Sequence, residues 1–71
     1  MRLSKSAYYF APIVIEDNVG IGLNSVIFPG VTIEEKSFVA PNSIVMSRVK
    51  SNSYVAGNPA KKIRERFWTK N

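Results

Sequence analysis

The chain has 71 residues, a net charge of +5 and neither cysteine nor histidine. A chain of this length forms one small domain with a marginal core, because it buries only about 60% of the surface that its unfolded form exposes. Disulfides are excluded and only carboxylates remain as metal ligands, so we expect no metal site and expect self-association to supply the missing stability.

Residues 1–12 are predicted to be an N-terminal segment, in which a basic start, "MRLSK", leads into an apolar stretch. This order loosely resembles a short signal peptide, but Pro12 interrupts the apolar stretch and no small-residue cleavage site follows. No stretch reaches the roughly 18 apolar residues of a membrane span. We therefore expect a cytoplasmic protein with no membrane partner.

Residues 13–57 contain a run of β-branched aliphatic residues at every sixth position. A helix repeats about every 3.6 residues and a strand every two, so neither period alone explains this spacing. Small or β-branched residues precede each of them by two positions, and such pairs point to the same side of a strand. Each repeat is therefore predicted to be a short strand with both positions facing inward. The sixth-position residues are Ile15, Ile21, Ile27, Ile33, Val39 and Val45, and those before them include Val19, Ser25, Val31, Ser37 and Ser43.

A third position in the repeat favours residues that tolerate positive φ. These residues follow each aliphatic residue by three positions, and they are Asn18, Asn24, Gly30, Lys36, Asn42 and Arg48. Asn and Gly adopt φ > 0 at the least cost, so this position is predicted to be a corner. Strands and corners in regular succession indicate a solenoid with stacked parallel strands. An antiparallel meander is the alternative, although its hairpins favour two-residue Asn-Gly or Gly-Gly turns, which are absent here.

Residues 58–71 are predicted to form a C-terminal helix and a basic tail. Asn58 suits a helix N-cap and Pro59 the first helical position, while Ile63 and Phe67 are four residues apart and would share one face over the open end of the solenoid. Lys61, Lys62, Arg64 and Arg66 surround that face. Such a basic segment is either a solvated face or a site for an anionic partner.

The repeats in "VGIGLNSVIFPGVTIEEKSFVAPNSIV" resemble the hexapeptide repeat of left-handed parallel β-helix acyltransferases. The continuation "SYVAGNPAKKIRERF" is similar to the segment that closes the β-helix in sugar and xenobiotic O-acetyltransferases of this group. The resemblance covers residues 12–67. It implies an all-β fold: a left-handed parallel β-helix of about two coils, with three hexapeptides per coil and a short C-terminal helix. Residues eighteen apart would then stack, so that Val26 lies over Ile44, and the outward Val26–Ile44 pair would be buried in a homotrimer.

The resemblance also implies acetyl-CoA as the co-substrate. Its pantetheine arm would lie between neighbouring β-helices, mostly against backbone amides, and its phosphates would lie toward the closing segment. Met46 and Ser47 stand where relatives often have Thr-Lys, a change that weakens phosphate binding. The residues carried over by position are Gly22, Leu23, Ala40 and Pro41 for the arm, and Ser47, Lys61 and Arg64 for the phosphates.

Two features depart from the family pattern. Relatives use a histidine as general base, which this chain lacks, so no catalytic residue is assigned. Gly20 stands where relatives usually carry tryptophan, in "VGIG" instead of "VWIG". The resemblance therefore implies an acetyl-CoA-dependent acetyltransferase-like protein acting on a hydroxyl or amine of a sugar or xenobiotic, and the missing histidine indicates a partial chain without its base. The alternative is a non-catalytic trimeric module that binds CoA-like anions or only assembles. Nucleic-acid binding is not expected, because no recognised motif is present.

Overall fold

The structure is a computed structural model, and it describes residues 11–67. Its strands are β1 (Val14–Ile15), β2 (Gly20–Ile21), β3 (Val26–Ile27), β4 (Thr32–Ile33), β5 (Phe38–Val39), β6 (Ile44–Val45), β7 (Ser53–Gly57) and β8 (Ala60–Glu65). The first six begin six residues apart, as the period predicts. No helix among the described residues is long and apolar enough to cross a bilayer.

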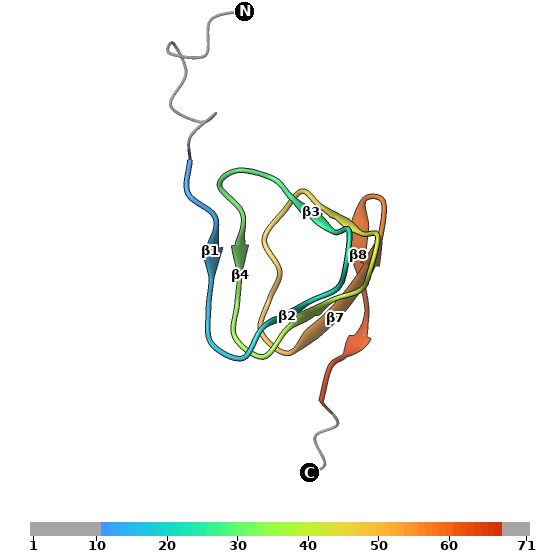
Figure 1. The fold of residues 1–71 in the computed structure, drawn as a ribbon. Helices are drawn as coiled ribbons and strands as arrows, with labels where there is room; N and C mark the ends of the chain where they lie inside the picture. Colours follow the sequence, from blue (N-terminus) through green and yellow to red (C-terminus); the bar gives the residue numbers. More distant parts are fainter. Residues whose placement is uncertain (1–10, 68–71) are drawn as a thin grey trace, which may run out of the picture.

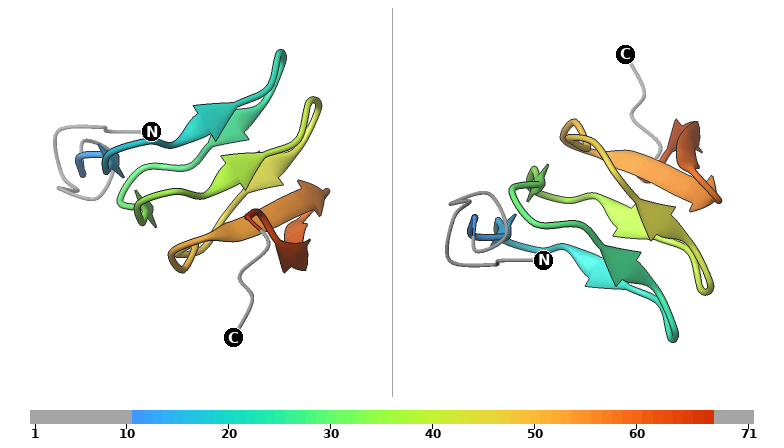
Figure 2. Two further views of the ribbon diagram at one scale, coloured as in Figure 1. Left: turned by 90° about the horizontal axis from the view of Figure 1, so that it is seen from below. Right: turned by 90° about the horizontal axis from the view of Figure 1, so that it is seen from above.

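The strands wind around a central axis and stack into three sheets (Figure 1). β1 pairs with β4, β2 with β5, and β3 with β6, all in parallel and eighteen residues apart. The predicted stacking is confirmed by this register, which places Val26 beside Ile44 and Gly20 beside Phe38. Figure 2 shows the coils from the side, layered one on another. The fold is therefore a parallel β-helix, and the antiparallel meander is excluded for these repeats.

The third coil is shorter than the two before it. Ile33 bridges Val49, and Val39 pairs with Val55, so the stacking distance falls from eighteen residues to sixteen. The predicted corner at Arg48 is wrong, because Arg48 is not among the residues with positive φ; in the third coil these are Asn52 (57°) and Gly57 (108°). The other five predicted corners are confirmed, with φ between 62° and 82° at Asn18, Asn24, Gly30, Lys36 and Asn42.

The predicted C-terminal helix is wrong. β8 pairs antiparallel with β7, and Gly57 faces Ala60, so that Asn58 and Pro59 form the turn of a hairpin. The physical reason is that β7 has an open edge, whose backbone N–H and C=O groups gain partners in β8. Ile63 is 61% exposed, so it does not cover the end of the core. Residues 68–71 of the predicted helix and tail lie outside the described residues.

The core lies inside the second and third coils. Its members are the buried residues Val31, Ile33, Val39, Val45, Val49 and Val55. The small position of the repeat is also confirmed, since Ser37 and Ser43 are fully buried near corners. Their hydroxyls bond to the next coil, where Ser37 Oγ donates to the carbonyl of Lys50 (2.7 Å) and Ser43 Oγ accepts from the amide of Gly57 (3.2 Å).

Candidate functional site

Four of the predicted cofactor residues meet at one corner of the solenoid, between the sheet of β2 and the sheet of β3. Gly22 and Leu23 in the first coil lie directly over Ala40 and Pro41 in the second, and we call these four residues the corner stack. The amide of Asn42 donates to the carbonyl of Leu23 (3.0 Å), which fixes the spacing of the two coils. The structure thus brings together residues that are seventeen or more positions apart in the chain.

Gly22 has no room for a side chain. A Cβ atom there would lie 2.5 Å from the backbone nitrogen of Pro41, far inside van der Waals contact. The amide of Gly22 donates to the carbonyl of Val39 (2.8 Å), so the backbone cannot move aside without losing a ladder bond. Leu23 is 82% exposed beside it. The absence of a side chain at Gly22 therefore lets the two coils pack backbone against backbone at this corner, with the exposed side chain of Leu23 beside it.

Ser47 and Lys61 lie at the end of the solenoid. Both line a hollow of about 410 Å³, which we call the terminal hollow and whose other lining residues fall between Val45 and Lys62. Arg64 does not reach it. The Arg64 guanidinium lies over the ring of Tyr54 (4.5 Å to the centroid) and donates to the carbonyl of Glu65 (2.7 Å). Of the three residues predicted to bind the phosphates, Ser47 and Lys61 therefore line the same hollow, and Arg64 lies outside it.

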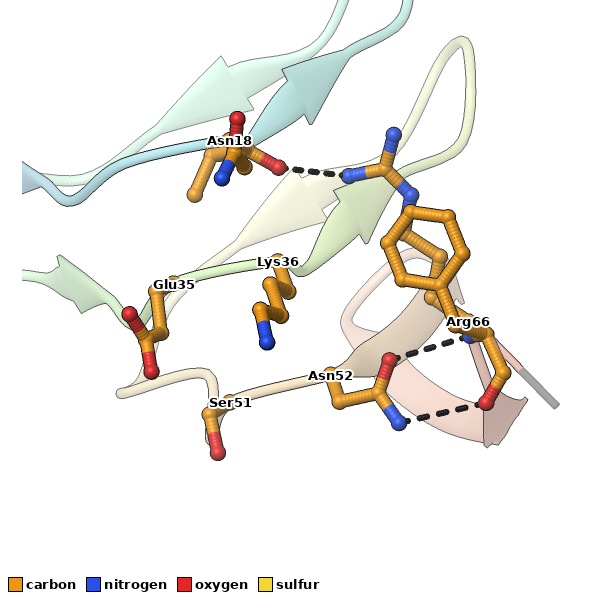
Figure 3. A pocket seen from close by; sticks show the side chains of 8 residues that line it. Asn18, Glu35, Lys36, Ser51, Asn52 and Arg66 are labelled. Atoms are coloured by element: carbon orange, nitrogen blue, oxygen red, sulfur yellow. Dashed lines mark hydrogen bonds between the residues drawn. The ribbon is translucent and has the colours of Figure 1, made fainter. Parts of the chain in front are cut away.

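A larger hollow, of about 670 Å³, lies at a different corner and holds none of the predicted cofactor residues (Figure 3). The left-handed residues Asn18, Lys36 and Asn52 stack there, one from each coil. Arg66 crosses the corner and donates through Nη1 to the carbonyls of Asn18 (2.7 Å) and Ser37 (2.9 Å). The Arg66 guanidinium thus donates its hydrogen bonds to backbone carbonyl groups. Sequence reasoning missed this hollow, because only the closing hairpin brings Arg66 to it.

The outward face of β2 and β5 compensates for the small residue at Gly20. The ring of Phe38 occupies this space, since a Cβ on Gly20 would lie 2.6 Å from Phe38 Cδ1. Phe38 stacks on Tyr54 (5.3 Å between centroids), and Arg66 lies over the Phe38 ring at 5.5 Å. An aromatic side chain from the second coil therefore covers the place where relatives carry their tryptophan in the first.

The charged side chains near the site form short surface pairs. Glu34 accepts from Arg48 Nε (2.6 Å), and this bond holds the pKa of the Glu34 carboxyl below its usual value. Lys62 lowers the pKa of Glu65 in the same way (2.5 Å). Both carboxylates are thereby stabilised as anions and made weaker bases. Within residues 11–67 no cluster of three or more metal-binding side chains occurs.

Comparison with known proteins places this geometry in a family. Residues 12–47 match the model described as the hexapeptide repeat of succinyl-transferase. The chain is 44% identical over 55 residues to 2,3,4,5-tetrahydropyridine-2,6-dicarboxylate N-acetyltransferase of Staphylococcus aureus, which covers 78% of this chain and 23% of that protein.

Solved structures agree with this match. A hexapeptide-repeat-containing acetyltransferase of Vibrio cholerae, solved with acetyl-CoA, has a TM-score of 0.78 and 49% identity over 80% of this chain and 31% of its own. A galactoside acetyltransferase solved with CoA has a TM-score of 0.77 and 44% identity over 80% of this chain and 28% of its own. The chain thus spans about a quarter to a third of the length of these relatives. It belongs to the hexapeptide-repeat acetyltransferases and shares their left-handed β-helix.

Proposed function

We propose that this chain provides the cofactor-binding coils of an acetyl-CoA-dependent acetyltransferase, which acetylates a hydroxyl or amine of a small molecule. The observation that carries the proposal is the corner stack, where Gly22 lets Pro41 pack against its backbone and the side chain of Leu23 is 82% exposed beside it. This corner belongs to a chain 49% identical to a protein solved with acetyl-CoA. The same cofactor favours a cytoplasmic location, since acetyl-CoA is made and used there.

Each predicted residue has a role in this proposal. Gly22, Leu23, Ala40 and Pro41 hold the extended arm of the cofactor along the corner stack. Ser47 and Lys61 receive phosphate oxygens at the adjoining end of the solenoid, and Arg64 adds positive charge from the outer face of β8. Acetyl-CoA, when bound, supplies an acetyl group activated as a thioester.

The acceptor must still lose a proton before its oxygen or nitrogen can attack that thioester. The chain contains no histidine for this step, and general acid–base catalysis typically contributes about 10²–10⁴-fold. We therefore expect binding of the cofactor without appreciable turnover by the 71-residue chain. Another polypeptide segment must supply the base in an active enzyme.

Calorimetric titration with CoA tests the binding directly. We expect wild-type binding to weaken as salt rises, because the phosphate contacts are exposed charge pairs. Lys61→Gln should weaken binding several-fold, whereas Lys36→Gln, which removes the same charge at a distant corner, should not. Gly22→Ala should abolish binding, provided that circular dichroism shows a folded protein. Absence of CoA binding by the wild-type chain at low salt would reject the proposal in favour of a purely structural module.

We also propose that the chain assembles as a homotrimer. Apolar side chains in β3 and directly after β6 are left in water in a monomer: Val26 is 46% exposed and Met46 44%. Phe28, 42% exposed, extends this surface. An apolar surface of this kind marks a subunit contact, and it supports the non-catalytic alternative equally well.

Light scattering should give three times the mass of the chain. Ile44→Asp should dissociate or unfold the assembly, because an unpaired charge at a buried contact costs several kcal/mol. Lys50→Asp, which places a carboxylate on an exposed corner, is the control. A monomeric mass at micromolar concentration would contradict the trimer while leaving cofactor binding to be judged by calorimetry.

A further inference from the structure

The terminal hollow exists because the third coil lacks one of its three sides. The sheet of β3 and β6 has two strands, while the sheet of β2 and β5 continues into β7 and β8. The chain turns back at Asn58–Pro59 and leaves the inner side of β6 without a strand beneath it. The core residues Val45 and Val55 therefore line the hollow, together with the start of β8.

One buried hydroxyl in the terminal hollow has no partner among the described residues. Ser53 is 1% exposed and lines the hollow, yet its Oγ forms no hydrogen bond with any described residue. Ser37 and Ser43, which occupy the same place in the repeat, both bond through Oγ to the next coil. Within residues 11–67 no further coil follows to which Ser53 could bond. A buried hydroxyl left unpaired is destabilising, so this atom points to a bound partner.

The side chains around the terminal hollow are basic. Four cationic residues line it, and no acidic residue does. Two of the four are neutralised by neighbours, since Arg48 pairs with Glu34 and Lys62 pairs with Glu65. Lys50 and Lys61 form no ion pair with any residue between 11 and 67. Two lysines without an ion pair among the described residues thus line a hollow that contains an unpaired hydroxyl donor.

We propose that the terminal hollow binds a small free oxyanion of the phosphate or sulfate type. One oxygen accepts the hydrogen of Ser53 Oγ, and the other oxygens face the ammonium groups of Lys50 and Lys61. Such an ion offers only hydrogen-bond acceptors, which suits a site whose hydroxyl and ammonium groups are donors. Val45 and Val55 form apolar walls beside these donors, and no acidic side chain lines the hollow.

This site goes beyond the proposed function, because its ligand is a free ion and because Ser53 faces the interior of the solenoid. Lys61 is shared with the proposed cofactor site. One consequence rests on the proposed function: the oxyanion should compete with CoA for Lys61, so that phosphate lowers the apparent affinity for CoA.

Thermal unfolding of the full chain in chloride buffer tests the site. Inorganic phosphate or sulfate, exchanged for chloride at constant ionic strength, should raise Tm by about 5–10 °C at tenfold excess over its Kd. Ser53→Ala and Lys50→Gln should each lose this rise. Ser51→Ala and Lys36→Gln, which remove a similar group away from the hollow, should keep it. Without phosphate, Ser53→Ala should melt no lower than wild type, because it removes an unpaired hydroxyl.

A rise of equal size in wild type, Ser53→Ala and Lys50→Gln would overturn the proposal, because it would reflect the general stabilisation that these salts give to folded proteins. No rise in wild type would overturn it too. Calorimetry with CoA in the presence and absence of phosphate separates the two proposals. CoA binding without a phosphate effect on Tm rejects the oxyanion site alone, and a phosphate effect without CoA binding rejects the cofactor site alone.

Discussion

The first and second coils carry the same six-residue pattern but differ in burial. Ile15 and Ile21 in the first coil are 47% and 40% exposed, whereas Ile33 and Val39, their neighbours in the second, are fully buried. The second coil has a coil on each side, and the first has one on a single side among the described residues. The repeat therefore specifies which side of each strand faces inward, while burial depends on the neighbouring coils.

The largest effect is expected from a matched pair of core substitutions. Ile33→Ala should lower the free energy of unfolding by about 2–5 kcal/mol, because it leaves a cavity in a fully packed layer. Ile15→Ala, at the same place in the first coil, should cost about 1 kcal/mol or less, since roughly half of that side chain is already in water. Urea unfolding at fixed protein concentration measures both. Equal losses would show that the first coil is covered as completely as the second.

The sequence predicted the features that repeat and missed those that break the repeat. The inward-facing positions and five corners follow from local preferences acting at each turn of the solenoid, so a single sequence was enough to find them. The stacking of residues eighteen apart was implied by the family resemblance. The shortened coil between Val45 and Val49 and the β7–β8 hairpin depend on pairing between distant strands. Ile63 and Phe67 are spaced as on a helix, yet pairing with the open edge of β7 decided the outcome.

The candidate site was predicted in part for the same reason. The corner stack follows from stacking eighteen residues apart, and the structure places its four residues together. Ser47 and Lys61 both line the terminal hollow only because the hairpin folds back. Arg64 lies further along β8, opposite Tyr54. The cofactor role of all seven residues stays a prediction. Ser53 gave no signal in the sequence, since the neighbouring repeats have serine at the same place.

A smaller effect is expected at the corner shared by both coils. Lys36 has φ of 66°, a conformation that costs a residue with a long side chain roughly 1–2 kcal/mol. Lys36→Gly should therefore raise the free energy of unfolding by about 1 kcal/mol, because glycine adopts positive φ freely. Asn18→Gly, at the same corner of the first coil, should change it little, since asparagine tolerates φ of 62°. Melting temperatures of the two variants test this expectation. A loss of stability in Lys36→Gly would show that the contacts of the Lys36 side chain stabilise the fold by more than its positive φ costs.

The smallest effect concerns acid stability in the second coil. The hydrogen bond from Arg48 lowers the pKa of Glu34 in the folded state, so its contribution is present above the unfolded value of 4.5 and is lost as the pH falls through the folded pKa. Glu34→Gln should therefore lose less stability than wild type between neutral pH and acid. Glu16→Gln removes a carboxyl from the same place in the first coil and is the control. Identical slopes of Tm against pH in Glu34→Gln and wild type would contradict the assignment.

Arg66 also determines how the two ends of the molecule open. In a stack where each layer touches only its neighbours, the ends fray independently. The backbone amide of Arg66 donates to Asn52 in the third coil (2.9 Å), and its guanidinium donates to Asn18 in the first. Arg66 also donates to Ser37 in the second coil, so this single residue contacts all three coils. Release of the closing hairpin consequently loosens the opposite end, and unfolding becomes more cooperative than the layered architecture alone would allow.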